Sequence, residues 1–164
     1  MPDARLVIEK HLGKGVFVDT NLLVLLLVGL VNPKRIQNFK RTQDFTLDDF
    51  HLLLKLLDLF GAPLITTPHV LSQVSDLTDL SGKERALVRA LFKSTIKEID
   101  EQYDPASVLV QNPTFERFGL GDASIAAVCK RNVLVLTADL QLQVALELLG
   151  LDALNFNHVR ALQW

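Results

Sequence analysis

Short apolar runs that end at a polar residue alternate with longer apolar stretches along this chain. Val16–Val18 is such a run and stops at Asp19, which is typical of a buried strand. The leucine-rich segment 22–31 carries no charged residue, so it predicts a helix that is buried on all sides. Asn32 and Pro33 mark its end. The pattern therefore predicts a buried strand that leads directly into a buried helix.

The same alternation continues to the end of the chain. Thr46 and Thr67 are expected to cap helices, Pro68 suits a first helical position, and Ser81 with Glu84 predicts a capping box. Further strands are predicted over residues 64–66, 108–110, 133–136 and 153–156, and further helices over 46–61, 81–100, 121–131 and 140–149 and from residue 68 onward. Strands that alternate with helices predict an α/β fold with a mainly parallel central sheet flanked by helices.

The composition is that of a folded protein with an apolar surplus. The 164 residues are 49% hydrophobic and 22% charged, with a net charge of −2, and 33 of them are leucine. These values exclude disorder and a globally basic nucleic-acid coat, and the length predicts one domain over residues 1–164. Mean hydropathy is +0.25. We therefore expect part of the apolar surface of segments 22–31 and 52–60 to be buried in a homodimer or against a partner.

Two further features bear on location and redox state. The single cysteine, Cys129, excludes an intramolecular disulfide framework, and its apolar neighbours predict a buried side chain rather than a reactive thiol. Segment 22–31 is the longest apolar run, and its ten residues are far fewer than the roughly 20 that cross a bilayer. The preceding residues, with Asp3, Glu9 and Asp19, do not resemble a signal peptide. We expect a cytoplasmic protein with no membrane contact.

Carboxylates follow two of the predicted strands. Asp19 comes directly after the first strand, Asp139 follows the strand over 133–136, and Asp122 lies at the start of a predicted helix. Ligands of a parallel sheet gather at the carboxyl ends of its strands. Three carboxylates at one point repel each other unless a cation lies between them, and such a set suits Mg²⁺ or Mn²⁺. This pattern predicts a metal site for phosphodiester chemistry. Each Asp on its own is equally explained as a helix cap.

These three carboxylates lie in ordered motifs. The motifs are Phe17-Val18-Asp19-Thr20-Asn21-Leu22-Leu23, Gly121-Asp122-Ala123-Ser124-Ile125-Ala126-Ala127 and Leu134-Val135-Leu136-Thr137-Ala138-Asp139. In order and approximate spacing they resemble the first, third and fourth acidic motifs of the PIN-domain nucleases, over about residues 16–157. The resemblance implies a three-layer α/β fold and a metal-dependent endoribonuclease that hydrolyses RNA phosphodiester bonds.

Residue roles follow from the same resemblance. Asp19, Asp122 and Asp139 would be the catalytic carboxylates that bind Mg²⁺ or Mn²⁺, while Asn21 and Thr137 would orient them or a bound water. Small single-domain members of the family are often toxins of type II toxin–antitoxin pairs, which dimerise and are inhibited by a bound antitoxin. RNA, an antitoxin protein and a second copy of the chain are therefore the implied partners.

One motif departs from the family pattern. PIN-domain nucleases usually have a glutamate on the helix after the second strand, and the aligned residue here is Gln73, which supplies no negative charge. Asp76 lies three residues further on, on about the same helix face, where it either substitutes for that glutamate or is an ordinary solvated residue.

A basic loop and two alternative functions complete the sequence-based interpretation. The loop stands where the family often contacts substrate, and its candidate RNA-binding residues are Lys34, Arg35, Lys40 and Arg41. The first alternative, favoured by Gln73, is a catalytically degenerate PIN-like module that binds RNA or protein. The second is a phosphatase of the haloacid-dehalogenase type, whose Asp-x-Asp motif resembles Asp19-Thr20-Asn21. Asn21 replaces the second aspartate of that motif.

Overall fold

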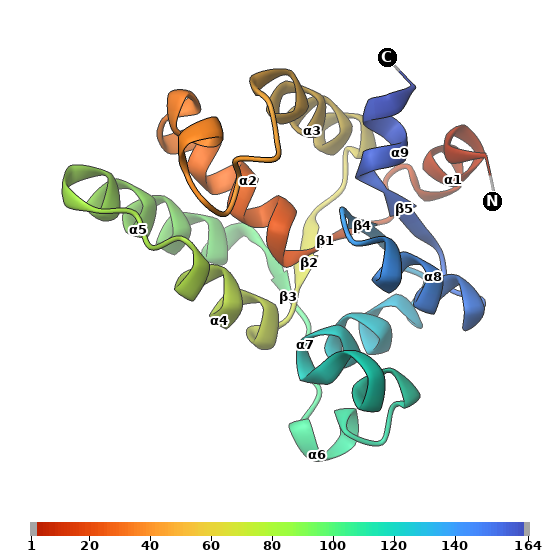
Figure 1. Cartoon of the computed structure of the whole chain (residues 1–164). Helices are drawn as coiled ribbons and strands as arrows, with labels where there is room; N and C mark the ends of the chain where they lie inside the picture. The colour runs from red at the N-terminus through yellow and green to blue at the C-terminus, as the bar shows by residue number, and fades with distance from the viewer. Residues whose placement is uncertain (1–2, 163–164) are drawn as a thin grey trace.

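The computed structural model describes residues 3–162, which form a parallel sheet with helices on both faces (Figure 1). The elements in chain order are α1 (Ala4–His11), β1 (Val16–Val18), α2 (Thr20–Val31), η1 (Pro33–Asn38), α3 (Leu47–Phe60), β2 (Leu64–Thr66), α4 (Pro68–Leu77), α5 (Gly82–Glu98), β3 (Asp100–Glu101), α6 (Ala106–Leu109), α7 (Pro113–Cys129), β4 (Leu134–Thr137), α8 (Leu140–Leu148), β5 (Ala153–Asn155) and α9 (Phe156–Ala161).

The five strands are all parallel, in the order β3-β2-β1-β4-β5. The chain runs outward from β1 to β3, then crosses back to β4 on the other side of β1. Figure 1 shows α2 to α5 on one side of the sheet and α7 and α8 on the other. The boundary between β1 and β4 is therefore a topological switch point, where α/β proteins bind ligands beyond the carboxyl ends of the strands. The predicted fold class is confirmed.

Local sequence signals account for most of these elements. Thr46 caps α3 through the Asp49 backbone nitrogen, and the Asp49 carboxylate accepts from the Thr46 nitrogen in return. Gly61 ends α3 in the left-handed conformation, at φ 54°, which glycine adopts without steric cost. Thr67 caps α4, with Pro68 in its first turn. These predicted boundaries are confirmed.

Two predictions of local structure are wrong. Residues 108–110 are not a strand, because Pro105 opens the helical turn α6 and its carbonyl accepts from the nitrogens of Val108 and Leu109. The Ser81 hydroxyl caps nothing. The Glu84 carboxylate instead accepts hydrogen bonds from Asn32 at 2.8 Å and from Arg35 at 2.7 Å. These are tertiary contacts, so Glu84 takes no part in capping the start of α5.

The apolar surplus of segment 22–31 is absorbed by the chain itself. All residues of α2 from Leu22 to Gly29 are buried, and α2 packs against η1, α3, α4 and α5. At Gly29 the Phe50 ring lies 2.4 Å from the position of an added Cβ, so only glycine permits this approach of α3. Segment 22–31 thus leaves Leu30, which is 49% exposed, as its large apolar surface residue.

Other described parts of the chain agree with the expectations from composition. Cys129 is buried, and burial raises the pKa of its thiol to about 12, so it is a small apolar side chain rather than a nucleophile. Among residues 3–162, no helix is both long and apolar enough to cross a membrane.

Candidate active site

Asp19 is the first residue beyond β1, and its carboxylate is held on several sides. Oδ1 accepts from the Leu22 nitrogen at 3.1 Å, which caps α2, and Oδ2 accepts from the Thr137 hydroxyl and from the Ala138 nitrogen at 3.1 Å. The residue is 4% exposed. Burial raises the pKa of Asp19, the three hydrogen bonds oppose this, and the net direction is upward. Asp19 is therefore both a helix cap and an oriented carboxylate at the switch point.

Asp139 likewise lies beyond the end of a strand, β4, and caps the helix that follows. Its Oδ1 accepts from the nitrogens of Gln141 and Leu142 at 2.7 and 3.1 Å and so caps α8. The buried Thr137 hydroxyl accepts from the Asp139 nitrogen at 2.9 Å while it donates to Asp19. One hydroxyl thus links the two strand ends.

Asp122 reaches the same region from α7. Helical geometry breaks at Gly119, at φ 86°, so Asp122 stands in the first turn of the second half of α7, close to the predicted helix start. Burial, the charge of Asp139 and that of Asp19, in this order, raise the pKa of Asp122 to about 6. Its carboxylate accepts no hydrogen bond from another residue in the described part of the chain. Asp139 is thus close enough for its charge to oppose the ionisation of both Asp19 and Asp122.

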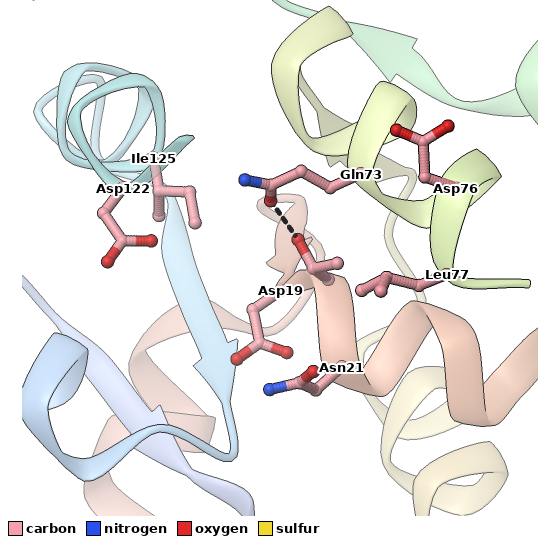
Figure 2. Close-up of a pocket in the computed structure, with 8 residues that line it drawn as sticks. Asp19, Asn21, Gln73, Asp76, Leu77, Asp122 and Ile125 are labelled. Carbon is pink, nitrogen blue, oxygen red and sulfur yellow. Dashed lines mark hydrogen bonds between the residues drawn. The ribbon is translucent and has the colours of Figure 1, made fainter. Parts of the chain in front are cut away.

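A pocket of about 430 Å³ lies between these elements (Figure 2). Its lining residues are Asp19, Thr20, Asn21, Gln73, Asp76, Leu77, Asp122 and Ile125. Five of the candidates from the sequence analysis therefore line one pocket: Asp19, Asn21, Gln73, Asp76 and Asp122. Asp139 and Thr137 stand outside this lining. Thr137 contacts it through its hydrogen bond to Asp19, and Asp139 acts on it through its charge. Figure 2 shows the Asp76 carboxylate directed away from Asp19 and Asp122, so in this arrangement it does not join their carboxylates.

The basic loop of residues 34–41 lies apart from the pocket lining. Arg35 pairs with Glu84 at 2.7 Å, and Lys40 pairs with Asp79 at 3.2 Å. Lys40 holds the pKa of Asp79 below its usual value. Two of the four candidate RNA-binding residues therefore already have acidic partners. Lys34 and Arg41 are exposed, and their side chains have no hydrogen bond or ion pair within residues 3–162.

Some lining residues were missed by the sequence analysis. Thr20 donates from its hydroxyl to Gln73 Oε1 at 2.9 Å, and its position between Asp19 and Asn21 in the first motif was the available signal. Leu77 and Ile125 form apolar parts of the wall. Their sequence context indicates only core packing, so only the tertiary structure identifies them.

The donor chemistry of the site fits a hard divalent cation. Asp122 has both carboxylate oxygens free of hydrogen bonds within residues 3–162. Burial and then the charges of Asp139 and Asp19 raise its pKa, and a bound cation would offset these effects. The carboxylates are not gathered into a finished coordination sphere. Across the described residues, no three His, Cys, Asp or Glu side chains already form a group that could hold a metal ion.

Comparison with known proteins does not assign this chain to a family. Neither a scan against protein-family models nor a search of curated proteins finds a match for the chain.

Proposed function

We propose that this chain is a PIN-like, divalent-metal-dependent endoribonuclease that acts in the cytoplasm. The observation that carries the proposal is the position of three carboxylates at one end of a parallel sheet. Asp19 and Asp139 end the two strands at the switch point, and Asp122 faces the same pocket from α7 with a pKa raised to about 6. The ordered motifs that resemble PIN-domain nucleases support the choice of phosphodiester chemistry.

The residues would divide the work as follows. Asp122 and Asp19, assisted by Asp139, would hold Mg²⁺ or Mn²⁺. Such an ion neutralises charge on a phosphodiester and lowers the pKa of water. Thr137 and the Ala138 nitrogen fix the Asp19 carboxylate before substrate binds, so that little reorganisation is needed. Asn21, exposed in the pocket wall, offers an amide to the substrate or its water.

Cleavage of single-stranded RNA in the presence of Mn²⁺ tests this proposal. Asp122→Asn removes one charge with little change in shape and should lower the rate at least 100-fold, given that removal of a single electrostatic contributor costs roughly 10²–10³ in rate. Asp58→Asn, an exposed aspartate near the end of α3, is the matched control and should retain full activity. Equal rates for wild type and Asp122→Asn, or no cleavage with Mn²⁺ supplied, would contradict the proposal.

The finer proposal is that the enzyme is the toxin of a toxin–antitoxin pair, with a bound antitoxin and a homodimer as partners. Expression should then arrest growth, and Asp122→Asn should abolish the arrest while Asp58→Asn leaves it. Because α2 is buried within the chain, the expected interface must use other apolar residues. Examples are Leu59 on α3, 51% exposed, and Leu148 on α8, 76% exposed. A monomer in light scattering would remove the homodimer from the proposal.

A catalytically degenerate binding module is the second candidate, and Gln73 favours it. Its amide replaces a charged carboxylate, and its carbonyl oxygen is already engaged by Thr20. Calorimetric titration with Mn²⁺ separates the two candidates. Saturable binding that is weakened by Asp122→Asn supports the nuclease, and absence of binding at millimolar metal supports the degenerate module.

A further inference from the structure

The carboxamide of Gln73 is oriented by a contact outside its own helix. Thr20, at the start of α2, donates its hydroxyl to Gln73 Oε1 at 2.9 Å (the dashed line in Figure 2). The carbonyl oxygen is the atom of an amide that ligates hard cations, whereas the NH₂ group is a donor only. The Thr20 hydroxyl uses one of the two lone pairs of this oxygen and fixes the direction in which the amide faces, so the NH₂ group is the free donor of this side chain.

The backbone of α7 provides the space for that nitrogen. Gln73 Nε2 lies 2.7 Å from the position that a Cβ on Gly121 would take, so the glycine leaves room for the amide. Figure 2 shows Nε2 on the side of the pocket that Asp122 occupies. Gln73 is exposed, and Nε2 donates to no other residue among residues 3–162. An oriented neutral donor without a protein acceptor thus faces a pocket whose charged groups are carboxylates.

We propose that Gln73 binds the substrate rather than the metal ion, by donating a hydrogen bond from Nε2 to a non-bridging oxygen of an RNA phosphate. This inference rests on the proposed nuclease function. It gives a role to Gln73, the residue at which the sequence departs from the pattern of the PIN-domain nucleases. A glutamate here would add a fourth carboxylate to Asp19, Asp76 and Asp122 and would repel a phosphate oxygen, whereas an amide attracts it. Hydrogen bonds to charged groups are the stronger ones, so loss of this contact should weaken phosphate binding roughly tenfold or more.

Nuclear magnetic resonance of the Gln73 side-chain NH₂ group tests the proposal without measuring activity. The ¹⁵N-labelled protein is saturated with Mg²⁺ and then titrated with adenosine 5′-monophosphate, a phosphate monoester with no phosphodiester bond to cleave. The Gln73 NH₂ signals, identified by their loss in Gln73→Glu, should move little with Mg²⁺ alone and should shift with the nucleotide. In Gln73→Glu, adenosine 5′-monophosphate should bind at least tenfold more weakly and Mg²⁺ more tightly.

Two controls keep the outcomes distinct. Gln111→Glu makes the same chemical change on an exposed residue outside the pocket lining and should leave both affinities unchanged. Thr20→Val frees the amide to rotate and should reduce the response of the Gln73 signals. If Asn21 signals shift with the nucleotide and those of Gln73 do not, the inference is overturned while the proposed function stands. If no pocket signal responds to Mg²⁺ or nucleotide, both fail.

Discussion

Replacement of Thr137 by valine removes the hydroxyl that links the two strand ends and leaves the side-chain volume nearly unchanged. Thr137 is completely buried, donates to the Asp19 carboxylate and accepts from the Asp139 nitrogen. A hydrogen bond to a charged group contributes about 1.5–3 kcal/mol. We therefore expect Thr137→Val to lower the free energy of unfolding by about 2–3 kcal/mol at alkaline pH, above the raised pKa of Asp19.

This loss should depend on pH, and its sign follows from the pKa of Asp19. The folded-state pKa is raised above the unfolded value, so the buried charge destabilises the fold increasingly as the pH rises through that pKa. The Thr137 hydroxyl is the largest of the contacts that oppose the rise. Below the raised pKa Asp19 is protonated, and the lost bond is then an ordinary neutral one of about 1 kcal/mol. The difference in the free energy of unfolding between wild type and Thr137→Val should therefore shrink toward about pH 4.

Urea unfolding followed by circular dichroism at both pH values measures this difference. Thr42→Val is the matched control, because Thr42 is also completely buried but donates to the neutral Ile36 carbonyl at 2.7 Å. It should cost about 1 kcal/mol at both pH values. A Thr137→Val loss that is independent of pH, or no larger than that of the control, would refute the assignment of Asp19 as a buried carboxylate stabilised by Thr137.

Three further predictions concern other parts of the fold. The Asn32 amide and the Arg35 guanidinium, which both donate to Glu84, lower the pKa of its carboxyl group. Glu84→Gln should therefore lower the free energy of unfolding at neutral pH. Measured by urea unfolding, this difference from wild type should vanish as the pH falls through the lowered pKa of Glu84; a difference that stays constant with pH would contradict the prediction. Gly29→Ala places a methyl group against the Phe50 ring and should cost about 1–3 kcal/mol in thermal unfolding; an unchanged melting temperature would show that α2 and α3 are less closely packed. Cys129, with its thiol pKa raised to about 12, should react with a disulfide reagent in urea and hardly at all in buffer, and rapid native labelling would disprove its burial.

Strands and caps with strong local signals were predictable from the sequence. The apolar run before Asp19 and the run before Thr137 correspond to β1 and β4, because buried parallel strands are continuously apolar. The edge strand β3, Asp100–Glu101, was missed, since its two residues are exposed and charged. Its pairing with β2 depends on backbone contacts that leave no hydrophobic pattern. The predicted strand over residues 108–110 failed because a proline-initiated turn outweighs the β propensity of Val-Leu-Val.

In the site, too, the features with local sequence signals were predictable and those set by tertiary contacts were not. The sequence predicted that Asp19 and Asp139 follow strands at the same edge of the sheet, and it offered capping and ligation as alternatives. That the two strands are neighbours comes from the structure. Capping is observed for both residues, and it places their carboxylates at the same sheet edge. The capping box predicted for Ser81 and Glu84 is absent, and the Glu84 carboxylate is instead engaged by Arg35, which is 49 residues away in the sequence.

The sequence by itself determined the alternation of strands and helices, most helix boundaries and which carboxylates end which strands, because these depend on side-chain period and on contacts within a few residues. Only the tertiary structure decided that α2 is covered by its own chain, that burial and neighbouring charges raise the pKa of Asp122, and that Thr20 engages the carbonyl oxygen of Gln73. These properties arise from desolvation and from hydrogen bonds between residues far apart in the chain, and neither is encoded in any local pattern.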